Sequence, residues 1–261
     1  MVELKDVSLT YALKHKKESA ALRQINARFD AGKFSAIIGP SGCGKTSLIK
    51  IMAGLLSPNG GTVFIGGSQL RGVCGQVAVI FQDYGLLPWK TVMDNAKLPL
   101  RIRNAKFGID RGGRQKVRNL LEEFGLGSFA DHYPRQLSGG MRQRLAIVRA
   151  LVAEPELLLM DEPFSSLDAL SREDAQDFIL SVQREHRLTV IMVTHSIEEA
   201  VYLADSVYVM NGVNPGSITG HIKISRNADS SHAGFREESL FQEYCGALRR
   251  ILQNRDKGGI P

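Results

Sequence analysis

Residues 34 to 46 read Phe-Ser-Ala-Ile-Ile-Gly-Pro-Ser-Gly-Cys-Gly-Lys-Thr. The apolar run Phe34 to Ile38 predicts a buried strand, and the apolar periodicity from Leu48 to Leu55 predicts a helix that begins near Lys45. Between them stand a glycine, four residues and Gly-Lys-Thr, the pattern of a phosphate-binding loop. In such a loop free backbone N–H groups and the positive end of the helix converge on phosphate oxygens. The stretch therefore predicts an α/β fold with a nucleotide site.

The residues of this loop have separable roles. Lys45 is expected to reach the β and γ phosphates, and Thr46 to offer its hydroxyl to Mg²⁺, which bridges phosphate oxygens. A glycine-rich turn without a ligand is the alternative, and the strand and helix on either side disfavour it. The predicted nucleotide-binding residues here are Gly39, Pro40, Ser41, Gly42, Cys43, Gly44, Lys45, Thr46 and Ser47.

A second group of candidate residues follows two further apolar runs. Leu157 to Met160 leads into Asp161-Glu162-Pro163, as a buried parallel strand would end at the carboxyl edge of its sheet, where α/β ligand sites form. Asp161 is expected to order Mg²⁺ through its water shell, and Glu162 to polarise an attacking water. His195 ends the predicted strand Thr189 to Val193 and would stand over the γ-phosphate, although a histidine at a strand end is more often structural.

A third segment, Leu137-Ser-Gly-Gly-Met-Arg-Gln-Arg144, lies between the first two. Ser138, Gly139 and Gly140 would present a hydroxyl and backbone N–H groups at a helix start to a γ-phosphate, and an ordinary helix entry is the alternative. The three segments in this order resemble the ATP-binding cassette (ABC) ATPases. In that family the Leu-Ser-Gly-Gly segment of one subunit closes over ATP held by another, which implies that this chain works as a homodimer.

The resemblance covers about residues 1 to 212 and extends to further positions. Gln82 matches the glutamine loop, which ligates Mg²⁺ and moves with a transmembrane partner. Asp168 ends Ser165-Ser-Leu-Asp168, which matches the loop that crosses the dimer interface. Tyr11 matches the aromatic that stacks on adenine, with a plain strand residue as the alternative. His195 follows Glu162 at the family's spacing, which implies that it orients the glutamate and the phosphate.

Length and composition agree with a cassette of this kind. The resemblance implies a P-loop NTPase core with a mainly parallel sheet, an N-terminal antiparallel β portion and an inserted α-helical subdomain. We expect an ATPase domain over 1–224, with the helical subdomain at about 84–150. The segment 225–261 would hold a linker and an amphipathic helix, because apolar residues recur there at helical spacing. They are Leu240, Phe241, Tyr244, Leu248, Ile251 and Leu252.

Cysteine usage and hydropathy bear on the location of the chain. The three cysteines have no metal-ligand spacing, which favours a reducing cytoplasm. No apolar run approaches the length needed to cross a bilayer, and the N-terminus does not resemble a signal peptide. The expected location is the cytoplasmic face of the cell membrane, where the chain would be peripheral. Only one cassette is present, so a second ATP site requires another chain.

The segment 101–118 contains seven basic residues and one acidic residue. Its net charge of +6 therefore equals the net charge of the whole chain. A solvated helical face is the favoured interpretation, and contact with anionic lipid or an acidic loop is the other. Nucleic acid binding is not expected, because interleaved aromatics and a recognition motif are lacking.

Trp89, the only tryptophan, lies in Leu86-Leu-Pro-Trp-Lys-Thr-Val-Met-Asp-Asn95. An aromatic among aliphatic neighbours has the composition of an interface anchor, and packing within the subdomain is the alternative. The stretch resembles the ATPase subunits of the nitrate, sulfonate and taurine importers, which work with two membrane subunits and a solute-binding protein. The resemblance implies an ATPase that energises uptake of a small solute. A soluble ABC clamp that remodels a macromolecule is the alternative, and nothing in the chain names the solute.

Overall fold

The computed structural model describes residues 1–12, 18–103, 111–212, 215–226 and 234–253. The chain forms two compact units: Met1–Cys74 with Asp177–Pro261, and Gly75–Gln176. One crossing between the units falls inside helix α6 (Ala169–Glu185). Among the described residues, no helix is long and apolar enough to cross a membrane. The domain limits expected from the sequence stay a prediction.

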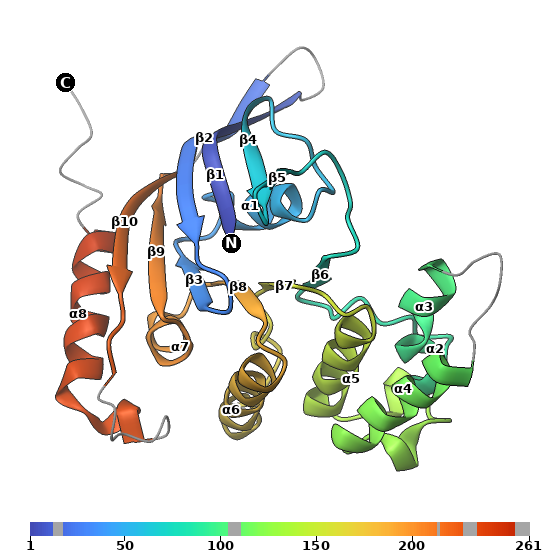
Figure 1. The fold of residues 1–261 in the computed structure, drawn as a ribbon. Helices are drawn as coiled ribbons and strands as arrows, with labels where there is room; N and C mark the ends of the chain where they lie inside the picture. Colours follow the sequence, from blue (N-terminus) through green and yellow to red (C-terminus); the bar gives the residue numbers. More distant parts are fainter. Residues whose placement is uncertain (13–17, 104–110, 213–214, 227–233, 254–261) are drawn as a thin grey trace, which may run out of the picture. The chain divides into compact units, whose positions relative to one another are not determined.

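An antiparallel sheet contains the N-terminal strands of the first unit (Figure 1). Its order is β2-β1-β4-β5, and the strands are β1 (Val2–Ala12), β2 (Glu18–Phe29), β4 (Gly60–Ile65) and β5 (Ser68–Gln69). Val2 and Leu4 are buried, and so are Val7 and Leu9, which shifts the alternation by one residue. A bulge with Asp6 at a φ of 51° lies at the shift and keeps both pairs on the core face. The predicted N-terminal β portion is confirmed.

A mainly parallel sheet forms the core of the first unit, with β10, β9, β3 and β8 as neighbours in that order. The strands are β3 (Phe34–Ile38), β8 (Thr189–Thr194), β9 (Ser206–Asn211) and β10 (Ser217–Lys223). Every residue of β3 and β8 is buried, which explains their continuous apolar runs. Ile38 pairs with Thr194, so the two strands end at one edge. Helices α1 (Lys45–Met52) and α7 (Ile197–Leu203) begin beyond it.

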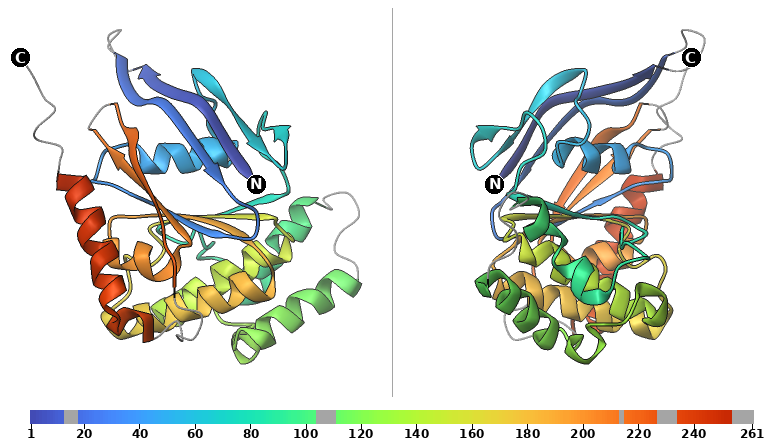
Figure 2. Two further views of the ribbon diagram at one scale, coloured as in Figure 1. Left: turned by 60° about the vertical axis from the view of Figure 1, so that its left-hand side comes forward. Right: turned by 90° about the vertical axis from the view of Figure 1, so that its right-hand side faces the viewer.

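The C-terminal helix α8 (Ser239–Gln253) follows a short 3-10 turn, Gly234–Glu237. It packs on α7, β9 and β10, and Figures 1 and 2 both show it beside β10. Phe241, Cys245 and Leu248 are its buried residues, spaced as one face of a helix. The amphipathic helix predicted from periodicity is therefore confirmed, and it belongs to the first unit.

The second unit combines two parallel strands with a group of helices. Strand β6 (Val77–Ile80) pairs with β7 (Leu157–Asp161), and every residue of β7 is buried. The helices are α2 (Val92–Ala96), α3 (Leu98–Arg103), α4 (Arg111–Glu123) and α5 (Gly139–Val152), with 3-10 turns at Gly127–Phe129 and Pro134–Gln136. Helix α5 contacts α2, α3 and α4, and Figure 2 shows these helices gathered together.

Candidate functional site

The phosphate loop joins β3 to α1, and glycines shape its backbone. Gly42 and Gly44 have φ values of 82° and 94°, in the left-handed region that side chains disfavour. A Cβ on Gly44 would lie 2.5 Å from Leu22 Cδ2 and 3.0 Å from the carbonyl oxygen of Ala21. Gly44 precedes the first turn of α1, which contains no acidic residue. The loop therefore leads into a positive helix end that suits a phosphate.

Lys45 is held within this loop. Its side chain is buried, and Nζ donates hydrogen bonds to the carbonyl oxygens of Gly39, at 2.8 Å, and Pro40, at 2.9 Å. Both acceptors are neutral carbonyls, so these bonds orient the ammonium without cancelling its charge. Such a cation is suited to phosphate oxygens, as the sequence predicts.

Tyr11 of β1 lies beside the same loop. Its hydroxyl is 3.0 Å from Ser47 Oγ, and the residue is 38% exposed. Thr46 is exposed as well. Because Tyr11 combines an exposed ring with a contact to the loop, it fits a role in holding the base. That role stays a prediction.

His195 follows β8 directly and is exposed. Since β8 is the parallel neighbour of β3, His195 and Gly39 both stand at the carboxyl edge of the sheet. The backbone here is fixed, because Thr194 Oγ1 donates to Glu199 Oε2 at 2.7 Å and accepts from the N–H of Ser196 at 3.1 Å. The structure thus places His195 at the same sheet edge as the phosphate loop.

In the second unit, β6 and β7 carry three predicted site residues to their carboxyl ends. Ile80 pairs with Met160, so Asp161, the last residue of β7, lies at the same edge as Gln82 and Glu162, which follow the two strands. Gln82 is exposed, Asp161 is buried and Glu162 is half-buried. Glu162 has a φ of 47°. This left-handed conformation is unfavourable in free energy for any residue that carries a side chain. Its geometry is therefore imposed by the surrounding contacts.

The signature segment forms the start of α5. Ser138 is the N-cap, and its Oγ accepts a hydrogen bond from the N–H of Met141 at 3.3 Å. Ser138 is exposed, and nothing lies within 4 Å of where a Cβ on Gly140 would be. On Gly139 a Cβ would come 2.9 Å from Leu167 Cδ2. The helix start thus presents a hydroxyl and N–H groups to the outside.

Asp168 stands immediately before α6. Its Oδ1 accepts from the N–H of Ser171 at 3.0 Å, the geometry of a helix N-cap. This backbone hydrogen bond lowers the pKa of Asp168 below its usual value. The residue therefore presents an exposed, charged carboxylate, and its predicted place at a dimer interface remains untested.

Trp89 is 70% exposed, so the alternative that it packs inside the helical subdomain is wrong. The loop that carries Trp89 is rigid, because the fully buried side chain of Asn95 makes four hydrogen bonds to the backbone of that loop. Asn95 Oδ1 accepts from the N–H of Leu87 at 2.8 Å, and its amide donates to the carbonyls of Leu87, Lys90 and Thr91 at 3.0–3.1 Å. An exposed, preorganised aromatic is suited to anchoring a partner.

The basic segment lies partly outside the described residues, which omit 104–110. Arg101 pairs with Asp94 at 2.9 Å and Lys116 with Glu154 at 2.5 Å. Arg114 and Arg118 are exposed. The two pairs favour a solvated and locally paired helical surface over a surface reserved for a partner.

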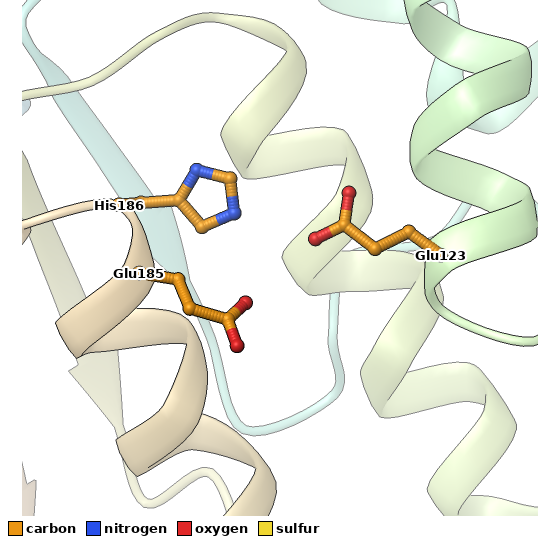
Figure 3. Close-up of side chains that lie close together, drawn as sticks. All are labelled: Glu123, Glu185 and His186. Carbon is orange, nitrogen blue, oxygen red and sulfur yellow. The ribbon is translucent and has the colours of Figure 1, made fainter.

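Two further features carry none of the predicted site residues. A cavity of about 250 Å³ in the first unit lies between the end of α1 and β4, and both apolar residues such as Ile51 and polar residues such as Gln69 and Arg71 line it. Figure 3 draws three exposed side chains: Glu123 at the end of α4 in the second unit, and Glu185 with His186 at the end of α6 in the first. Exposed acidic groups are common on protein surfaces, and we assign no metal to these.

Each unit therefore brings part of the predicted set together. The first holds the phosphate loop with Tyr11 and His195, and the second holds Gln82, Asp161 and Glu162 at one strand edge with the exposed signature segment. Sequence reasoning missed the side chains that join the segments of the second unit, which are the buried Tyr84 and Gln143 and the half-buried Arg149. No local pattern marks them, because their partners are distant in sequence.

Known ATP-binding proteins resemble this chain over most of its length. It is 44% identical over 236 residues to an aliphatic sulfonates import ATP-binding protein of Agrobacterium fabrum, covering 90% of this chain and 85% of that protein. It is 40% identical, with the same coverage, to an uncharacterised ABC transporter ATP-binding protein of Methanocaldococcus jannaschii. A nitrate import ATP-binding protein of Synechocystis is 35% identical, over 90% of this chain and 89% of that protein.

Solved structures agree with these relatives. The post-hydrolysis dimer of the ATP-binding cassette MJ0796, bound to ADP and Pi, matches with a TM-score of 0.74 and 30% identity, over 87% of this chain and all of that one. The family model described as ABC transporter matches residues 22–165. The phosphate loop, Gln82, the signature segment and Glu162 all lie inside that range. With its P-loop core and these relatives, the chain belongs to the ABC transporter family of ATP-binding cassettes.

Proposed function

We propose that this ATPase energises the import of a small solute, such as nitrate, a sulfonate or taurine, across the cytoplasmic membrane. The names of the relatives support import. The observation that carries the mechanism is the start of α5, where Ser138 and Gly140 face outward in a chain with a single phosphate loop. A helix start of this kind binds the phosphate of a nucleotide held by another copy.

In the proposed cycle ATP joins two copies of the chain. Lys45 and the loop N–H groups of one copy hold the phosphates, and Ser138 and Gly140 of the other close over the γ-phosphate. Tyr11 stacks on the base. Only the closed pair completes a site, so nucleotide binding is converted into motion.

The proposed chemistry is hydrolysis of the bond between the β and γ phosphates. Glu162 accepts a proton from the attacking water, the water oxygen bonds to the γ-phosphorus, and ADP leaves with the bridging oxygen. His195 orients Glu162 and the γ-phosphate. The chemistry of the donors fits Mg²⁺, a hard ion that prefers oxygen ligands: Thr46, Asp161 and Gln82 would hold it, and it would neutralise charge on the phosphates.

The proposed partners are two transmembrane permease subunits and a solute-binding protein, with the chain on the cytoplasmic face of the membrane. Trp89 supports this arrangement, because a rigid loop presents it to the outside. A coupling segment of each permease subunit would bury the indole and sense movement at Gln82 through the loop between them.

The test begins with Glu162→Gln. We expect this variant to bind ATP, to lose at least about 100-fold in kcat, and to accumulate as a dimer with ATP and Mg²⁺ in light scattering. Glu173→Gln, which changes an exposed glutamate on α6, serves as the control and stays monomeric at normal turnover. A Glu162→Gln protein that stays monomeric or hydrolyses ATP at the normal rate contradicts the scheme.

The partner is tested in the same background. Tagged Glu162→Gln protein is recovered from membranes in mild detergent, and copurifying proteins are identified by mass spectrometry. We expect a polytopic membrane protein that is lost with Trp89→Ala and kept with Val73→Ala, a change at an equally exposed apolar residue. Recovery of soluble protein or nucleic acid alone would favour a remodelling clamp.

A further inference from the structure

Three segments of the second unit meet around Tyr84. The residue follows the glutamine loop, is 4% exposed and has a φ of 61°. Its hydroxyl lies 3.1 Å from Ser166 Oγ and 3.4 Å from the carbonyl oxygen of Pro163. Pro163 and Ser166 belong to the loop that follows Glu162. One side chain therefore links the segment after Gln82 to the segment after Glu162.

Arg149 of α5 fixes the backbone of Tyr84. Its NH2 donates to the carbonyl oxygen of Tyr84 and its NH1 to that of Gly85, both at 2.6 Å. Partial burial lowers the pKa of this guanidinium, and its planar fork of donors fixes the two carbonyl acceptors in one geometry. Tyr84 and Gly85 both have positive φ values, so these bonds hold a backbone turn that is otherwise unfavourable.

Gln143 of the same helix reaches the other side of the junction. The side chain is buried, and Nε2 donates to the carbonyl oxygen of Pro163 at 3.3 Å. This carbonyl therefore accepts from both Tyr84 and Gln143. Ser165 adds a bond from Oγ to the carbonyl oxygen of Glu162 at 2.9 Å. Together they hold the backbone on both sides of the peptide bond between Glu162 and Pro163.

From this geometry we infer that Tyr84 is a positioning residue for hydrolysis, whose hydroxyl ties the conformation of the glutamine loop to the backbone that orients Glu162. Helix α5, which begins with the signature segment, holds both ends of this link through Arg149 and Gln143. A shift of the glutamine loop is thereby transmitted to the carboxylate. Small displacements of a catalytic group reduce turnover strongly. The inference rests on the proposed role of Glu162.

The test removes one oxygen atom. In full-length protein, we expect Tyr84→Phe to lower the kcat for ATP hydrolysis about 10-fold, with the dissociation constant for ATP unchanged within about twofold because the phosphate loop is untouched. Tyr208→Phe is the matched control: Tyr208 is 5% exposed, and its hydroxyl also donates to a backbone carbonyl, that of Arg28. It leaves kcat unchanged.

A double-mutant cycle separates the link from a general loss of packing. If Tyr84 acts through Ser166, then Tyr84→Phe combined with Ser166→Ala lowers kcat no further than Tyr84→Phe alone. Multiplicative losses, or a Tyr84→Phe protein with normal kcat and normal thermal unfolding, overturn the inference. Glu162→Gln in the same assay separates failure of the inference about Tyr84 from failure of the proposed function. If Glu162→Gln hydrolyses ATP at the normal rate, the proposed function itself is wrong.

Discussion

At the residue scale, the two glycines of the phosphate loop differ in the reason they are required. Gly42 needs only its left-handed backbone, because nothing lies within 4 Å of where its Cβ would be. Gly44 needs the same backbone and the empty space as well, since Leu22 and the Ala21 carbonyl occupy the place of a Cβ. The sequence shows a glycine at both positions. Only the structure shows that a side chain at Gly42 would strain the backbone, whereas one at Gly44 would also clash with its neighbours.

This difference predicts unequal losses of stability. Gly42→Ala should lower the free energy of unfolding by about 1–2 kcal/mol, the cost of a left-handed alanine. Gly44→Ala should lower it by at least about 2 kcal/mol more, because the β3 to α1 turn must move away from Leu22. Urea unfolding without nucleotide measures both. Equal losses would mean that the loop relaxes freely and that Leu22 sets no limit.

At the element scale, Arg226, which follows β10, caps the C-terminal end of α7. Arg226 donates from NH2 to the carbonyl oxygens of Val201, Tyr202 and Ala204 at 3.3, 2.9 and 2.8 Å, and so satisfies the end of that helix. Its pKa is lowered, chiefly by burial. Arg249 of α8 instead pairs with Glu198 near the start of α7, and both side chains are about half exposed.

We predict that Arg226→Met lowers the free energy of unfolding by about 2–3 kcal/mol, because it leaves helix carbonyls without their charged donor. Arg249→Met should cost less than about 1 kcal/mol, as an exposed pair does. Both changes keep an unbranched side chain. Urea unfolding at one salt concentration gives the two values, and a larger loss for Arg249→Met would mean that the surface pair, not the helix cap, holds α7.

An element could be predicted from the sequence where neighbouring residues alone determine it, and not where it depends on distant residues. Strands β3, β7 and β8 are buried throughout, so their apolar runs identify them, and the periodicity of α8 does the same. Arg226 lies in the stretch 225–234, where polar composition predicts a linker, and residues 227–233 fall outside the described part of the chain. Composition cannot indicate a half-buried cap whose acceptors lie more than twenty residues away.

The candidate site divides in the same way. Lys45, Asp161, Glu162 and Ser138 are specified by motifs, because binding a phosphate demands particular residue types at fixed local spacing. Arg149 and Tyr84 are 65 positions apart, and neither belongs to a motif that demands the other. Their contact follows from the packing of α5 against the loop after β6. Motifs in the sequence therefore predict the candidate catalytic residues, whereas the contacts that position them can be identified only from the fold.

At the scale of the whole molecule, the exposed start of α5 predicts that each ATP site draws on two chains. Lys45→Ala removes the phosphate-binding ammonium. Ser138→Asp keeps a good helix N-cap and puts a negative charge where the γ-phosphate of the partner would lie. Each variant alone should be inactive, because every site in either homodimer lacks one component.

Mixing the two purified variants should restore activity. Random pairing makes half the dimers mixed, and one of the two sites in a mixed dimer is built from the intact loop of one chain and the intact signature of the other, so about a quarter of the sites recover. Hydrolysis rates and nucleotide retained after rapid gel filtration measure the recovery. Cross-linking would show whether mixed dimers form. If they form and yet retain no nucleotide, the whole site lies within one chain, because each variant would then disable the site in its own chain and no intact site would remain.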